Sequence, residues 1–214
     1  MNDDRMGGIA LIAGTAGMLV IMALHPTGRE LFTPGQLEQT IRMSQSVHTL
    51  AIACLPIHWL GALALSRWLA SSSRLEVAAL VVYTLSSLAA LMAAVPSGFL
   101  APGIARVMLR AQVPATEAWR AIFDYNGRIN QAYARIWIVA LSAAVVLWSV
   151  VFMRRPRVAR AIGIYGVLIG AVVALAVGIG HLRLDVHGAG IAVLAQAAWF
   201  FAAGILLWAV PRQR

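Results

Sequence analysis

The sequence predicts an all-α integral membrane protein, in which a single membrane domain (residues 1–214) forms a bundle of six transmembrane helices. Composition is the first indication: 61% of residues are hydrophobic and 12% are charged, against about 45–50% and about 25% in soluble domains. The second is a series of six apolar runs, each long enough for the roughly 20 helical residues that cross the hydrocarbon core. Arginine-rich turns between some of these runs are the third.

The expected helices span, in order, residues 6–24, 47–68, 77–100, 134–153, 159–180 and 188–210. The first run differs from a secretory signal peptide, because Asp3 and Asp4 stand beside Arg5 ahead of it and no small-residue cleavage site precedes His25. We therefore expect this first helix to be retained in the bundle.

Six crossings place both termini on the same side of the membrane. The short turn at 154–157 reads Arg-Arg-Pro-Arg, and Arg212 and Arg214 stand at the end of the chain. Short arginine-rich turns stay on the cytoplasmic side. We expect a bacterial inner membrane with both termini cytoplasmic, although further arginines on the other side reduce the charge difference.

Two long connections lie on the side opposite the termini, and each contains signals for a short interfacial helix. In the first, the segment 33–36 has a capping threonine followed by proline, a typical helix start that can run on into the second transmembrane helix. In the second, Pro96 and Pro102 are expected to loosen the end of the preceding helix. A short helix is then expected from Thr116, with Trp119, Ile122 and Phe123 on one face.

Four of the five histidines are expected at one membrane level, because helix parity brings the ends that carry them to the same side. These are His25, His48, His181 and His187, and Asp185 lies between the last two. Imidazole is a good ligand for zinc and copper, and a carboxylate can act as a ligand or orient a histidine. We therefore predict a metal site with these histidines as ligands and Asp185 as a catalytic group. The alternative is that each histidine is an ordinary interfacial residue.

A polar face enters the fourth helix at the same level. Asn126, Asn130, Tyr133 and Arg135 follow each other at spacings close to one helical face. Polar groups at membrane depth usually face the interior of a bundle. We predict that these residues, with Arg183 nearby, line a cavity and bind a cofactor or ligand; simple hydration at the interface is the alternative.

Two further features have competing interpretations. His58 lies ten residues after His48, about 15 Å deeper along a helix, and is expected to be a structural histidine bonded to a neighbouring serine or carbonyl. Gly166 and Gly170 have the GxxxG spacing of close helix packing. The same glycines would also leave room for a flat cofactor such as haem, or serve a homodimer.

These features lead to three functional hypotheses. The first is a membrane-embedded metalloprotein, with zinc or copper, that hydrolyses a lipid-like substrate at a His/Asp site opening to the outer face. The second is a b-type haem protein that exchanges electrons with a quinone. The third is a non-enzymatic transporter or scaffold. The net charge of +9 comes from arginine alone, and no basic run is interleaved with stacking aromatics, so nucleic acid is not an expected partner.

Overall fold

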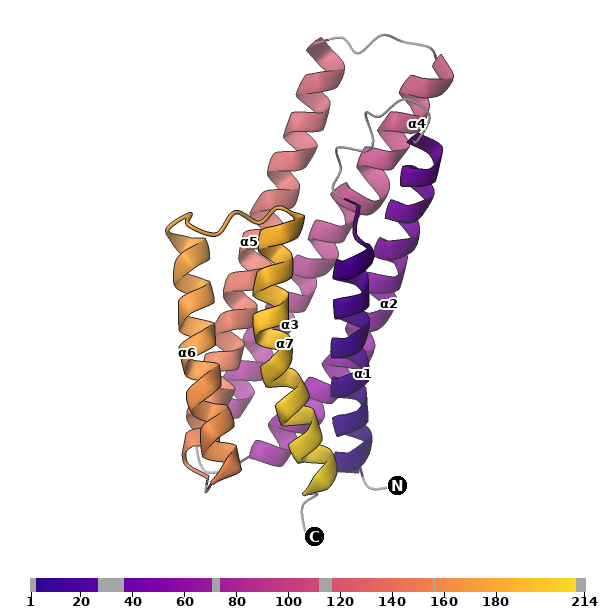
Figure 1. Cartoon of the computed structure of the whole chain (residues 1–214). Helices are drawn as coiled ribbons and strands as arrows, with labels where there is room; N and C mark the ends of the chain where they lie inside the picture. The colour runs from indigo at the N-terminus through magenta and orange to yellow at the C-terminus, as the bar shows by residue number, and fades with distance from the viewer. Residues whose placement is uncertain (1–2, 27–36, 71–73, 112–116, 156, 211–214) are drawn as a thin grey trace.

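The structure is a computed structural model that describes residues 3–26, 37–70, 74–111, 117–155 and 157–210, with only the backbone for 109–111. These residues form an all-helical bundle (Figure 1). Its elements are α1 (Asp3–Leu24), α2 (Leu37–Leu69), α3 (Leu75–Val95), the π-helix η2 (Pro96–Leu100), α4 (Ala101–Ala111), α5 (Glu117–Met153), α6 (Val158–Gly178) and α7 (Val186–Ala209).

The expected fold class is confirmed. Within the described residues, six helical segments are long and apolar enough to cross a membrane, and α3, η2 and most of α4 together make one of them. The most extensive helix pairs are α3 with α5, α5 with α6, α1 with α2 and α1 with α7. The chain is therefore an integral membrane protein built as a six-helix bundle.

The two ends of the bundle differ in shape. Both termini lie at one end, here called the terminal end, and His25 and His48 lie at the other, here called the histidine end. There α2, α5 and the α3–α4 segment extend well beyond α1, α6 and α7 (Figure 1). The 37 residues of α5 correspond to about 55 Å of helix, whereas the hydrocarbon core is about 30 Å thick.

The two long connections are more helical than expected. Pro96 does not loosen the helix, because the wider π-turn of η2 accommodates the proline and the chain continues directly into α4. A short helix is present in this connection, but it is α4. The segment expected to form a separate interfacial helix, up to Phe123, is instead the start of α5, which runs unbroken to Met153. In the first connection, α2 begins at Leu37, while the expected helix start at 33–36 lies outside the described residues.

An aromatic core fills the terminal end of the bundle. The rings of Trp148 and Trp199 stack with centroids 5.9 Å apart, and Phe152 and Phe200 contact Trp199 edge-on. Tyr83 packs on Trp148 from α3. This cluster is buried and closes the bundle at this end.

The glycines of α6 serve helix packing within the chain. A Cβ atom on Gly163 would lie 2.7 Å from the carbonyl oxygen of Ser149, and one on Gly170 would lie 2.8 Å from Cγ2 of Val146. Gly166 likewise faces Ser149 and Trp199. Because α5 and α7 fill the space beside these glycines, this face has no room for a haem and is covered within the monomer.

Candidate functional site

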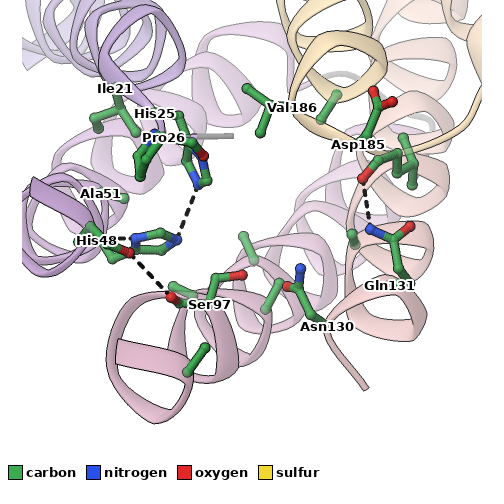
Figure 2. Close-up of a pocket in the computed structure, with 18 of the residues that line it drawn as sticks. Ile21, His25, Pro26, His48, Ala51, Ser97, Asn130, Gln131, Asp185 and Val186 are labelled. Carbon is green, nitrogen blue, oxygen red and sulfur yellow. Dashed lines mark hydrogen bonds between the residues drawn. The ribbon is translucent and has the colours of Figure 1, made fainter. Parts of the chain in front are cut away.

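A cavity of about 470 Å³ opens at the histidine end, between α1, α2, α3 and η2 on one wall and α5 and α7 on the other. Figure 2 shows the two walls, with His25 and His48 on the first and Asn130, Gln131 and Asp185 on the second. Most other lining residues are apolar. The cavity is therefore polar toward the histidine end and apolar toward the middle of the bundle.

His25 and His48 contact each other directly. Their Nε2 atoms are 3.2 Å apart. Nδ1 of His25 donates to the carbonyl oxygen of Pro26 at 2.8 Å, and Nδ1 of His48 donates to that of Ser44 at 2.7 Å. A carbonyl can only accept, so both Nδ1 atoms carry hydrogen. In neutral rings both Nε2 lone pairs then point into the contact, whereas a proton on one Nε2 or a metal ion between the two nitrogens would join them.

Gly98, inside the π-helix η2, leaves the space in which His48 lies. A Cβ atom on Gly98, inside η2, would clash with Cβ and Cγ of His48, so only glycine fits at this position. Two carbonyls of η2 are also anchored to the neighbouring helices. Ser44 donates to the Ser97 oxygen at 3.2 Å, and Asn126 donates to the Pro96 oxygen at 3.0 Å. These bonds fix α2 and α5 against η2 around the cavity.

The opposite wall offers an amide to the cavity. The side chain of Asn130 is half-buried and directed toward the open space (Figure 2). Gln131 instead anchors the wall by donating to the Leu184 carbonyl at 2.8 Å. Asp185 caps α7 by accepting from the backbone N–H of Gly188 at 2.9 Å, and its exposed carboxylate is turned away from the histidine pair. Asp185 immediately precedes the first residue of α7, the position at which aspartate often caps a helix.

The cavity lining carries the opposite charge from the chain as a whole. The net charge of the chain is +9, yet the charged side chains among the described lining residues are Asp124 and Asp185, with no arginine. This lining favours neutral or cationic groups over anions.

The structure brings together some of the residues predicted to form the site and separates others. His25, His48, Asn126, Asn130 and Asp185 all line the cavity. The other five predicted residues do not line it. Tyr133 is half-buried, and the remaining four are exposed: Arg135, His181, Arg183 and His187. Among the described residues, no group of three or more His, Cys, Asp or Glu side chains is placed to hold a metal ion. The metal site therefore stays a prediction, and its geometric basis is now the His25–His48 pair alone.

The pair suits a small ion better than a haem. With metal–nitrogen bonds of about 2.0–2.1 Å, nitrogens 3.2 Å apart subtend about 100° at a metal, near the tetrahedral angle. Two histidines on opposite faces of a haem would place their nitrogens about 4 Å apart in a line through the iron. The rings of His25 and His48 are instead inclined at 70° with centroids 4.8 Å apart. These residues do not form a haem sandwich.

His58 forms a separate, deeper network. The Thr15 hydroxyl donates to the Leu11 carbonyl at 2.7 Å, so it accepts from Nε2 of His58 at 3.0 Å. Nδ1 of His58 then accepts from the Tyr83 hydroxyl. His58 is therefore neutral in this network, and its partners are a threonine and a tyrosine on other helices rather than the expected serine or carbonyl.

A second, smaller pocket of about 40 Å³ lies beside this network. It shares four lining residues with the larger cavity: Met18, Leu55, Trp137 and Val193. Gln196 of α7 also lines it and is 1% exposed. Thr15, Tyr83 and Ser86, from two other helices, line the same space, and the sequence gives no indication that these residues lie beside Gln196.

The fold and the site together define a helical integral membrane protein with an amphipathic internal cavity and a paired-histidine site at its mouth. Comparison with protein-family models, with curated proteins and with solved structures gave no match to this chain.

Proposed function

We propose that this protein binds a lipid-like molecule in the cavity at the histidine end. The carrying observation is the cavity itself: its volume of about 470 Å³ is in the range of small-molecule sites, and its lining changes from polar to apolar with depth. The headgroup would lie between the histidine pair and Asn130. The tail would lie against Met18, Leu55 and Trp137. This orientation matches that of a bilayer lipid.

A cavity-filling variant tests this proposal. Ala90 lines the cavity from α3, whereas Leu88 is 54% exposed on the same helix and points away from the bundle. With a fluorescent monoacylglycerol analogue as the probe, we expect Ala90→Phe to weaken binding at least about ten-fold, and the matched control Leu88→Phe to bind like the wild type. Equal binding by all three proteins, or none by the wild type, would contradict the proposal.

The Nε2 contact supports a second candidate function, a zinc or copper site at His25 and His48. Carbonyl groups that hold the outer nitrogen of a ligating histidine are the usual support of such sites. A bound zinc ion would supply a Lewis acid and an activated water for hydrolysis. With Asn130 on the opposite wall to orient a carbonyl, the substrate would be a lipid-like ester or amide.

Two pairs of substitutions distinguish this site from the wider set of histidines. Metal content would be measured in protein purified without chelator and dialysed against zinc. We expect about one ion per chain in the wild type and in a His181→Ala, His187→Ala double variant, and loss of the ion in His25→Ala, His48→Ala. A wild type without metal, or dependence on His181 and His187, would rule out the paired site.

The other two hypotheses have less geometric support. A haem–quinone protein requires a haem site that the histidine pair does not provide, and a Soret band in the purified protein would revive it. A transporter requires a path through the bundle, whereas Tyr83, Phe200 and Trp148 fill the space below the deeper pocket. The blocked lower end favours a binding site.

We further propose a bacterial inner membrane with cytoplasmic termini. The turn between α5 and α6 carries Arg154, Arg155 and Arg157, and it lies at the same end as both termini (Figure 1). Clusters of this kind face the cytoplasm. A C-terminal alkaline phosphatase fusion is expected to be inactive and a green fluorescent protein fusion to fluoresce; the opposite pair of results would reverse the orientation.

A further inference from the structure

Gln196 has a buried acceptor without a donor. Its Nε2 donates to the Ser142 hydroxyl at 3.2 Å, and that hydroxyl donates to the Ile138 carbonyl at 2.8 Å. Because the Ser142 hydrogen is already used, the amide orientation is fixed. Oε1 of Gln196 has no hydrogen-bond partner. A buried acceptor in this state is costly unless something in the adjacent pocket donates to it.

The hydroxyls that line the small pocket cannot supply that donor. Thr15 donates to the Leu11 carbonyl and Tyr83 donates to His58. Ser86 donates to the Trp137 carbonyl at 3.0 Å, and Ser87 to the Tyr83 carbonyl at 3.0 Å. Each hydroxyl has one hydrogen, so all four can now only accept. None of these four hydroxyls can therefore donate to Gln196, whereas an occupant that carries a hydroxyl group can.

The small pocket adjoins the inner end of the larger cavity. The four residues that line both spaces include the flexible side chains of Met18 and Leu55. Along α2, the levels of His48 and His58 differ by ten residues, or about 15 Å. An extended alkyl chain with its head at the histidine pair can span this depth.

We propose that the inner pocket binds a hydroxyl group at the far end of the lipid-like ligand, with Gln196 Oε1 as its acceptor. The ligand would thus carry a polar group at each end. This inference rests on the proposed function and adds the chemical class of the ligand. A single ordered water offers the same O–H chemistry, and a pocket of about 40 Å³ is large enough for one.

A comparison of two alcohols distinguishes a ligand hydroxyl from a water as the donor to Gln196. Dodecanediol, with a hydroxyl at each end, and dodecanol, with one, would compete with the fluorescent monoacylglycerol analogue. We expect the wild type to bind the diol about ten-fold more tightly, because only the diol brings a donor to Gln196. In Gln196→Leu the two affinities should become equal through loss of diol binding. Gln45→Leu, the same change at a residue outside both pockets, should keep the preference.

Three results would overturn the proposal. Equal affinities in the wild type would mean that water, not the ligand, satisfies Gln196. A diol preference that survives in Gln196→Leu would place the second hydroxyl elsewhere. Failure of both alcohols to compete would reject the lipid-binding function and this inference together. Unchanged dodecanol affinity shows that the variant is folded, and Gln196→Met provides a second test if the leucine variant is unstable.

Discussion

The outer histidine pair and the deep histidine network make opposite use of the same side chain. His48 and His58 are equally buried, each 5% exposed, and each sits against a glycine, Gly98 and Gly14 respectively. Around His58 every hydrogen bond has one donor and one acceptor, and the network is complete with neutral groups. Between His25 and His48 the two anchoring bonds use both available hydrogens, and two lone pairs remain facing each other.

Burial alone therefore does not distinguish the surroundings of these two histidines. The two environments differ in whether the N–H and O–H hydrogens present are enough to place one in each observed contact. A complete network stabilises the fold, whereas two acceptor nitrogens that face each other need a proton or a metal ion between them. Substitutions in the two regions should therefore have different consequences.

The largest effect is expected at His58. His58→Ala removes both bonds of the deep network and the ring that packs on Phe200 at 4.7 Å. We expect the free energy of unfolding, measured by detergent denaturation, to fall by about 3 kcal/mol. Zinc binding at the outer pair should be unchanged in the folded fraction. A loss below about 1 kcal/mol would show that the deep network is not a main support of the fold.

The next largest loss of stability is expected from filling the space that Gly98 leaves for His48. Gly98→Ala places a Cβ against the His48 side chain, which should cost about 2 kcal/mol of unfolding free energy and weaken zinc binding. The control is Gly103→Ala, because Gly103 has open space around it. That variant should be neutral or up to about 1 kcal/mol more stable, from helix propensity alone. Similar behaviour of the two variants would mean that η2 does not shape the site.

A smaller loss is expected from Tyr83→Phe. This change removes one hydroxyl and leaves Nδ1 of His58 without a donor, which should cost about 1–2 kcal/mol. In a double-mutant cycle with His58→Ala, the effect should disappear once His58 is absent. Additive effects of the two substitutions would argue against a coupled network.

The smallest effect on stability, and the clearest contrast, is expected at His25. His25 is half-buried at the end of α1, so His25→Ala should change the unfolding free energy by less than about 0.5 kcal/mol. Zinc affinity should nevertheless fall at least about ten-fold, because one of the two nitrogens is lost. A large loss of stability with unchanged zinc binding would assign the outer pair the structural role of His58.

The sequence predicted the bundle well because length and hydropathy determine which segments cross a membrane. Counting crossings also placed the outer histidines at one end correctly. It could not predict how each helix is rotated about its axis, and this rotation leaves His187 of α7 exposed while turning His48 of α2 inward. His181 is exposed because it lies in the connection between α6 and α7. Those rotations depend on packing between helices that are distant in sequence.

The sequence also failed to predict the course of the helix at Pro96. Proline and glycine together predict a helix end, but the π-turn of η2 absorbs both and continues the helix. The wider turn is supported by bonds from Ser44 and Asn126, which lie 53 and 30 residues along the chain from their respective acceptors. Such support has no local signature. Of the polar run expected to face a cavity, Asn126 and Asn130 line it, whereas Tyr133 and Arg135 do not. Spacing along one helix indicates which residues share a face, but not how far that face borders the cavity.

The position of Trp137 has a practical consequence for spectroscopy. Among the described residues that line the cavity and the inner pocket, Trp137 is the one tryptophan, while Trp148 and Trp199 are packed in the core at the terminal end. A ligand that fills the cavity will change the surroundings of this indole. Brominated alkyl chains should therefore quench its emission, and the chain contains its own optical reporter of occupancy.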